Sequence, residues 1–206
     1  MSDEPEAIIK EMKARYLTLE SYSDSGTVKN IPPVGKASTE FKTYFERPSR
    51  VRFEWRSWHP HFGKRLEPDD NVVFSDGSSH RCYFLGEDSD AESLEMILSA
   101  AFGVSSASSL AILKLLVPDC ITVKNYWANM TDLEMDDSDQ LQFPCYHIKG
   151  SPSRGGLNEV WIKKDDLTVR RVLWALTWIP LFSSIEFNYS EVCLNPKLDE
   201  RLFVKR

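Results

Sequence analysis

The stretch from Thr39 to Trp58 constrains the fold more than any other part of the chain. Over two consecutive arms its side chains alternate between apolar and polar. A period of two is typical of a β-strand with one buried and one solvated face. The run Arg47-Pro48-Ser49-Arg50 between the arms indicates a turn, so we expect an antiparallel hairpin. Its inward positions carry Phe41, Phe45, Val51, Phe53 and Trp55.

Arg47 is the exception to this pattern. It has the same parity as Phe41 and Phe45, so a strand that extends this far would direct its charge toward the apolar side. An unpaired buried charge is costly, and a guanidinium in this position therefore needs acceptors.

Composition limits the class of protein. The chain has 206 residues, of which 42% are hydrophobic and 27% charged, which suits a single domain over residues 1–206 with a substantial core. A net charge of −6 disfavours a nucleic-acid binder, which would carry a basic surplus. Because no run of about 18 apolar residues occurs, we expect no transmembrane helix.

The N-terminus is polar and has no signal-peptide core, which leaves two locations open. The protein is cytoplasmic if Met1 is native, and periplasmic or elsewhere in the cell envelope if a leader has been removed. The cysteines allow three pairings, but none forms a CxxC pair, so free thiols are favoured over a disulfide framework. They are Cys82, Cys120, Cys145 and Cys193.

Helical spacing predicts a helix over 6–19, with Ile8, Ile9, Met12 and Tyr16 on one face. A polar strand should follow over 21–31. Asp76-Gly77 between two apolar runs predicts a second hairpin.

The middle of the chain changes character. Residues 87–117 predict two helices: the first is capped by Asp88, Ser89 or Asp90 and ended by Gly103, and the second is capped by Ser105 or Ser106. The second helix, over 108–117, is apolar on nearly all sides, so we expect it to be buried on both sides. Further strands are predicted at 121–127, 145–149, 158–164, 168–178 and 184–192.

The candidate catalytic and metal-binding groups are weak. His59-Pro60-His61 lacks a third ligand, and the acidic run over 136–139 lacks the glycine and glutamate of a calcium loop. No GxSxG, P-loop or Rossmann motif occurs. We therefore expect no metal, no cofactor and no enzymatic activity. The apolar pattern allows either a filled core or a container with a cover, and the second mid-chain helix and Arg47 favour the container.

Two runs of residues, one around Arg47-Pro48 and one around Asp76-Gly77, resemble the lipoprotein carrier family LolA, with the related LolB. The run Glu46-Arg47-Pro48-Ser49-Arg50 lies between Phe45 and Phe53, and Val73-Phe74-Ser75-Asp76-Gly77 falls where the family has its "SDG" hairpin. The predicted order of elements also agrees.

The resemblance implies an α+β fold: a strongly curved antiparallel sheet, or unclosed β-barrel, with an N-terminal helix and a two-helix lid over about 88–117. It implies an apolar cavity for acyl chains, with Arg47 as a latch that binds lid carbonyls. The implied lipid-binding residues are Phe41, Phe45, Val51, Phe53 and Trp55 from the hairpin, and Leu94, Ile97, Leu98, Leu110 and Leu113 from the lid.

The resemblance implies acyl chains or a lipoprotein as ligand, together with an envelope protein partner, and we expect a monomer. Two other interpretations stay open. One is a small-molecule enzyme or sensor on a helix-grip-like sheet, which should show a convergent acid–base pair inside. The other is a filled-core domain that binds proteins.

Overall fold

The computed structural model describes residues 4–31, 37–58, 60–61, 64–65, 70–84, 86–120, 127, 130–136, 141–152, 159–176 and 183–204. Its main feature is an 11-stranded sheet in which every neighbouring pair is antiparallel. Across the sheet the strands are β8 (Glu87–Ala91), β7 (His80–Phe84), β6 (Asp70–Ser75), β3 (Arg50–Trp58), β2 (Ala37–Glu46), β1 (Ser21–Ile31), β13 (Ser183–Leu194), β12 (Val169–Leu176), β11 (Glu159–Lys163), β10 (Cys145–Pro152) and β9 (Met130–Met135).

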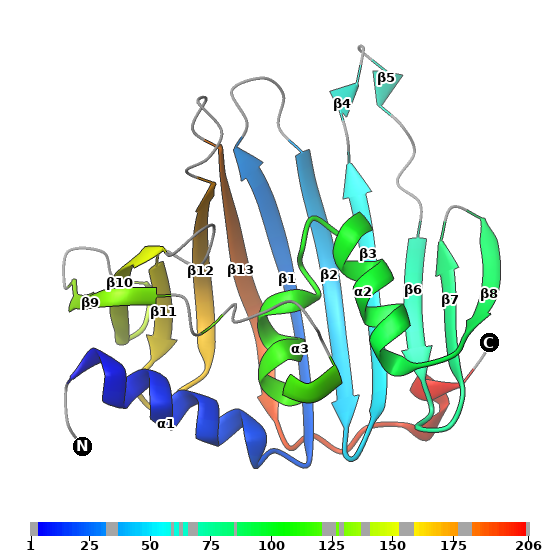
Figure 1. The fold of residues 1–206 in the computed structure, drawn as a ribbon, viewed down its shortest axis with the longest axis horizontal. Coiled ribbons are helices and arrows are strands. Elements are labelled where there is room, and N and C mark those ends of the chain that lie inside the picture. Colours follow the sequence, from blue (N-terminus) through cyan, green and yellow to red (C-terminus); the bar gives the residue numbers. More distant parts are fainter. Residues whose placement is uncertain are drawn as a thin grey trace.

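The sheet is not closed. The pairing of β1 with β13 joins the N-terminal and C-terminal parts of the chain in the middle of the sheet, and β8 and β9 form its two edges. Figure 1 shows β9 lying almost across the direction of the central strands, as expected of a strongly twisted sheet. The predicted fold, an unclosed antiparallel sheet with helices, is confirmed. A separate two-stranded ribbon pairs β4 (Pro60–His61) with β5 (Lys64–Arg65).

Three α-helices lie in the described part of the chain: α1 (Pro5–Leu17), α2 (Leu94–Val104) and α3 (Leu110–Leu116). They cover one face of the sheet, which we call the inner face, with α2 and α3 over the central strands and α1 across the lower ends of the strands nearer β9 (Figure 1). Two short 3-10 helices complete the described elements, η1 (Pro118–Cys120) and η2 (Glu200–Phe203).

The hairpin predicted from Thr39 to Trp58 forms as β2 and β3. Phe41 pairs with Trp55, and Phe45 with Val51. These side chains are buried, which confirms the direction assigned to them by the alternation. The Asp76-Gly77 turn also forms, between β6 and β7. The Asp76 carboxylate accepts hydrogen bonds from the amides of Ser78 and Ser79, at 2.8 Å each.

The mid-chain region differs from the prediction at its start. Residues 87–91 are not part of a helix but form the edge strand β8. Arg81 on β7 pairs with Asp88 at 3.0 Å and with Asp90 at 2.9 Å, and these contacts across two strands hold an acidic segment in the sheet.

The boundaries of the two mid-chain helices also need correction. Ser93, and none of the predicted residues, caps α2: its Oγ accepts from the Met96 amide at 3.2 Å. The helix continues through Gly103 to Val104. The next helix begins at Leu110, after Ser109, rather than at Ser105 or Ser106.

The prediction that the second mid-chain helix is buried on both sides is confirmed. From Ala111 to Val117 every side chain is buried except that of Lys114, which is half-buried. Its Nζ donates to the carbonyl of Pro118 at 2.6 Å. The strand predicted over 121–127 lies outside the described residues except for Trp127, and so do His59 and residues 137–139. All four cysteines are free thiols, as expected.

Candidate functional site

A ladder of aromatic side chains crosses the inner face of β2 and β3. The rings of Phe41 and Phe53 have centroids 6.1 Å apart, and those of Phe53 and Trp55 are 5.6 Å apart. Tyr189 on β13 meets Phe41 edge-on at 5.5 Å. We call these four residues the aromatic ladder. Each is at most 5% exposed, so the inner face presents a continuous aromatic surface to the helices above it.

The helices supply the opposite wall. Leu94, Ile97 and Leu98 of α2 and Leu113 of α3 are at most 6% exposed and belong to the same hydrophobic cluster as the aromatic ladder. The side chain of Leu110 lies outside the described residues. The structure thus brings together the other predicted lining residues from both walls. In this arrangement the two helices are closed over the sheet.

The connection between α2 and α3 is unusual for a buried segment. Ser106 and Ala107 have positive φ angles of 54° and 63°, a region that residues other than glycine seldom adopt. The hydroxyls of Ser105 and Ser109 are buried, and neither has a hydrogen-bond partner within the described part of the chain. A buried hydroxyl without a partner costs free energy. The closed position of this turn is therefore less favourable than that of an ordinary, fully bonded turn.

A polar contact joins this turn to the sheet. The Oγ of Ser106 lies 3.3 Å from the Oγ1 of Thr39 on β2, which also meets the Ser57 hydroxyl on β3 at 2.9 Å. Elsewhere α2 packs on β6, β7 and β8, and α3 packs on α1. The α2–α3 pair is thus held by extensive apolar packing, by the hydroxyl contact at Ser106, and by the hydrogen bond from the Trp127 indole to the Ala111 carbonyl of α3 at 2.7 Å.

The predicted partner of Arg47 is wrong. Its Nε donates to the carbonyl of Leu19 at 2.7 Å, and its second terminal nitrogen donates to the carbonyls of Leu17 at 2.6 Å and Tyr16 at 3.3 Å. These carbonyls are at the C-terminus of α1, not on the mid-chain helices. Arg47 does bind backbone carbonyls at the end of a helix, as expected, because a helix C-terminus offers unpaired carbonyls and partial negative charge. The helix, however, is α1 and not one of the mid-chain pair.

Further contacts hold α1 in place. The Tyr16 hydroxyl accepts from the Val169 amide at 3.1 Å, and the side chain of Asn195 accepts from the Glu20 amide at 2.9 Å. The Arg47 guanidinium also lies over the Phe45 ring, 5.3 Å from its centroid. Arg47 directly follows β2 and therefore anchors the C-terminus of α1 to the turn of the hairpin.

Asp24 is an inner-face residue that sequence reasoning missed. It is 4% exposed, and it accepts a hydrogen bond from the Tyr22 hydroxyl at 2.8 Å. Burial raises the pKa of Asp24 to about 6, although the hydroxyls of Thr43 and Tyr22 act in the opposite direction. Burial also raises the pKa of Tyr22 well above its usual value, so its hydroxyl stays protonated and donates to the Asp24 carboxylate.

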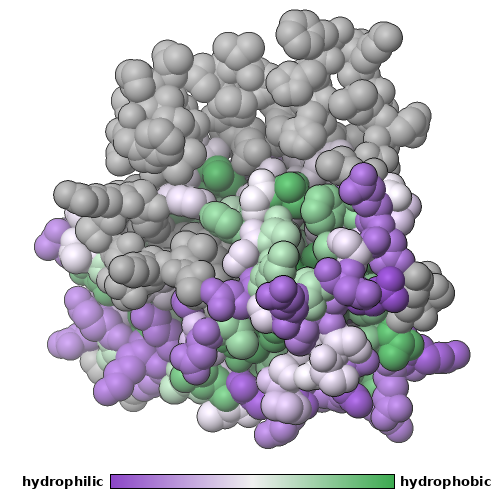
Figure 2. Space-filling view, turned by 45° about the vertical axis from the view of Figure 1, so that its right-hand side comes forward, coloured by the Kyte–Doolittle hydropathy of each residue, from purple (hydrophilic) through white to green (hydrophobic). Residues whose placement is uncertain are grey.

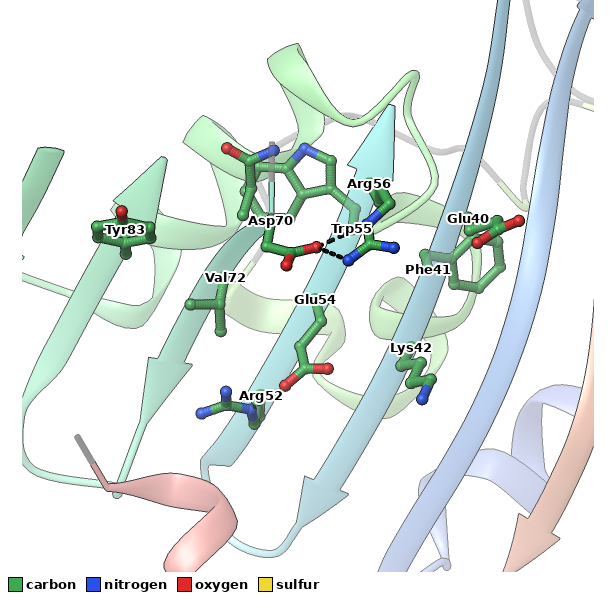
Figure 3. Close-up of a pocket in the computed structure, with 11 residues that line it drawn as sticks. Glu40, Phe41, Lys42, Arg52, Glu54, Trp55, Arg56, Asp70, Val72 and Tyr83 are labelled. Carbon is green, nitrogen blue, oxygen red and sulfur yellow. Dashed lines mark hydrogen bonds and ion pairs between the residues drawn. The ribbon is translucent and has the colours of Figure 1, made fainter. Parts of the chain in front are cut away.

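The outer face carries a pocket of about 470 Å³ across β2, β3, β6 and β7 (Figure 3). Four of the charged side chains that line it form two pairs: Arg52 pairs with Glu54 at 2.6 Å, and Arg56 Nε donates to Asp70 at 2.7 Å. These four charged groups therefore already have partners, whereas Glu40 and Lys42 also line the pocket.

Apolar side chains also reach the surface of the helical cover. Met96 and Val104 of α2 are 55% and 43% exposed. Figure 2, which brings this side of the molecule forward, shows hydrophobic residues at the surface above a largely hydrophilic lower half. Within the described part of the chain no group of three or more His, Cys, Asp or Glu residues could hold a metal ion. None of the helices described is long and apolar enough to cross a membrane.

The fold defines a class: an unclosed antiparallel sheet with helices over one face. Neither a family model nor a curated protein matches the sequence. Among solved structures, LprF from Mycobacterium bovis is similar with a TM-score of 0.54 and 10% identity, covering 97% of each chain. This likeness concerns the fold.

Two further solved structures are less similar. The MucA/MucB complex from Pseudomonas aeruginosa has a TM-score of 0.49 and 13% identity, covering 97% of this chain and 60% of the other. A LolA superfamily protein from Nitrosomonas europaea has a TM-score of 0.38 and 7% identity, with 97% of each chain covered.

Proposed function

We propose that this protein binds and carries acyl chains, of a lipid or of a lipidated protein, without catalysing a reaction on them. The chains would lie between the aromatic ladder and the α2–α3 pair, in a protein of the cell envelope. The observation that carries the proposal is the meeting of two apolar walls, the aromatic ladder and the leucines of α2 and α3, beneath a turn with two buried hydroxyls that lack partners among the described residues. The resemblance of the hairpin residues to LolA and LolB supports the same class of ligand.

In such a site the free energy gained by burying an acyl chain is partly offset by the cost of separating the helices from the sheet. An acyl chain gains about 0.8 kcal/mol for each buried CH₂ group. Separating α2 and α3 from the aromatic ladder costs part of that gain, because their leucines are already buried against it. A ligand that binds only the open form shifts the population toward that form. A carrier benefits from this balance, since it must also release what it binds.

A filled-core protein-interaction domain is the second candidate. The observation in its favour is that the described lining side chains are at most 6% exposed and that the rings of the aromatic ladder contact one another directly. In that case the helices would stay closed, and apolar probes would not enter.

A disulfide that fixes the turn to the sheet separates the two candidates. Thr39→Cys with Ser106→Cys places sulfur atoms where hydroxyls now lie 3.3 Å apart. The background is Cys120→Ser with Cys193→Ser, which removes the two thiols that are not fully buried. We expect oxidation to weaken uptake of a dansyl-labelled fatty acid at least about tenfold, and reduction to restore it.

Ser25→Cys with Ser190→Cys is the matched control. These hydroxyls are 2.9 Å apart and exposed, and they join β1 to β13 away from the helices. This crosslink should leave uptake unchanged. Equal uptake by the oxidised and reduced Thr39–Ser106 pair, or no uptake by either, would contradict the proposal.

A further inference from the structure

A second apolar groove lies between α1 and β9, at the edge of the sheet farthest from β8. Its volume is about 490 Å³, within the range of small-ligand sites. Its described lining comes from α1, from Trp127 and from β9. It is lined by Glu6, Ile9, Lys10, Lys13, Ala14, Leu17, Trp127, Met130 and Leu133.

The floor of this groove is apolar and firmly built. Ile9, Trp127 and Met130 are 6%, 6% and 8% exposed, whereas Leu17 at the rim is 48% exposed. The indole Nε1 of Trp127 donates to the carbonyl of Ala111 in α3 at 2.7 Å. The backbone carbonyl of Trp127 accepts a hydrogen bond from Lys13 Nζ at 3.0 Å. Trp127 is thus fixed between α1 and α3, and it lines the groove.

The charge at the groove is positive. Lys10 and Lys13 are three residues apart on α1 and therefore lie on the same side of the helix. Lys13 is half-buried, and the loss of hydration lowers the pKa of its ammonium group. Within the described part of the chain neither lysine has a carboxylate within ion-pair distance. Glu6 is the single acid among the described lining residues.

We propose that this groove binds one acyl chain that carries an anionic headgroup. The chain would lie on Ile9, Trp127, Met130 and Leu133, and the headgroup would accept hydrogen bonds from Lys10 and Lys13. A half-buried ammonium with a carbonyl as its acceptor is well placed to bind an anion, because charge-assisted hydrogen bonds are the stronger kind. A carboxylate of a fatty acid and a phosphate of a phospholipid share this chemistry. The groove does not depend on the site beneath α2 and α3.

Quenching of tryptophan emission by dibromostearate tests the proposal, since bromine quenches a tryptophan that it contacts. It is measured in the oxidised Thr39→Cys/Ser106→Cys protein, so that Trp55 beneath the helices does not contribute. We expect quenching that includes Trp127 and that is lost in Trp127→Phe. Lys10→Gln with Lys13→Gln should weaken binding of the acid about tenfold and leave that of its methyl ester unchanged. Lys42→Gln with Lys197→Gln removes the same charge elsewhere and should have no effect.

Ala14→Glu provides a variant that should fold normally, because Ala14 is exposed on α1. It places a carboxylate in the groove and should abolish binding of the acid. Brominated phosphatidylglycerol vesicles, tested in parallel, show whether a phosphate headgroup binds as the carboxylate does, and binding of either supports the proposal. Quenching that persists in Trp127→Phe, or an equal loss in the two lysine pairs, would overturn it.

The oxidised Thr39→Cys/Ser106→Cys variant keeps the two sites apart. It should lose uptake beneath the helices and retain quenching in the groove. If the groove binds no fatty acid while uptake beneath the helices persists, the groove proposal is contradicted and the proposed carrier function is not. If the groove binds the fatty acid and no uptake occurs beneath the helices, the proposed carrier function is contradicted and the groove proposal is supported.

Discussion

The N-terminal helix and the mid-chain helix pair cover the same face of the sheet, but they are attached to it differently. The C-terminus of α1 receives three hydrogen bonds from Arg47, and its Tyr16 hydroxyl accepts from the backbone of β12. The turn between α2 and α3 has two residues at positive φ and two buried hydroxyls without partners among the described residues. Its contact with β2 is a 3.3 Å hydroxyl pair.

This difference assigns separate roles to the two helical parts. Polar contacts of α1 fix it to the sheet, whereas α2 and α3 rest on it through apolar packing that another apolar molecule could replace. The part of the cover that moves should therefore be α2–α3. Arg47 belongs to the fixed part, so its contribution should be to stability rather than to ligand release.

Arg47→Leu should have the largest effect. The substitution removes charge-assisted hydrogen bonds and leaves helix carbonyls without partners, which we expect to lower the free energy of unfolding by about 3 kcal/mol. Urea denaturation measures this loss. Arg50→Leu is the control, because its ion pair with Glu46 is over a third exposed on the Arg50 side and should be worth less than about 1 kcal/mol. A slower release of bound fatty acid with unchanged stability would instead restore Arg47 as a latch.

Asp24→Asn should have a pH-dependent effect of up to about 3 kcal/mol. Its folded pKa of about 6 is raised above the ordinary value of 3.8, so the carboxyl is neutral in both states below about pH 4. The cost of burying its charge develops between these values and is complete above pH 6. The variant should therefore be more stable than the wild type at pH 8 and equally stable at pH 4. Thermal unfolding at the two pH values measures this, and a pH-independent difference would contradict it.

Two serines in the α2–α3 turn should show opposite, smaller effects. Ser109→Ala removes a buried hydroxyl without a partner in the described structure and should stabilise the protein by about 1 kcal/mol. Ser108→Ala removes a hydroxyl that donates to the Ser105 carbonyl at 2.6 Å and should destabilise it by a similar amount. Equal signs for the two substitutions would show that the turn is not held as described.

Local patterns predicted much of this architecture. Alternation over β2 and β3 identified the inward residues, because a half-buried strand has a period of two. The apolar composition of residues 110–117 identified a helix buried on both sides. These features depend on neighbours in the sequence, which a single chain displays directly.

The features that were missed depend on contacts between distant residues. The acidic strand β8 is held by Arg81 on the neighbouring strand, and the acceptors of Arg47 lie 28–31 residues earlier in the chain. Asp24 lies between two serines in a polar strand, so no local pattern marks it as inward-facing. The α1–β9 groove likewise joins segments from opposite parts of the sequence.

Native-state hydrogen exchange of the whole chain tests the central claim most directly. If α2 and α3 open over a fixed α1, amides of 94–116 should exchange through openings at least about 2 kcal/mol below global unfolding, and those of α1 only with global unfolding. In the Ala14→Glu variant, whose α1–β9 groove should bind no fatty acid, a bound fatty acid should change exchange in 94–116 and not in α1. Equal protection of the two helical parts, with and without the ligand, would contradict the account.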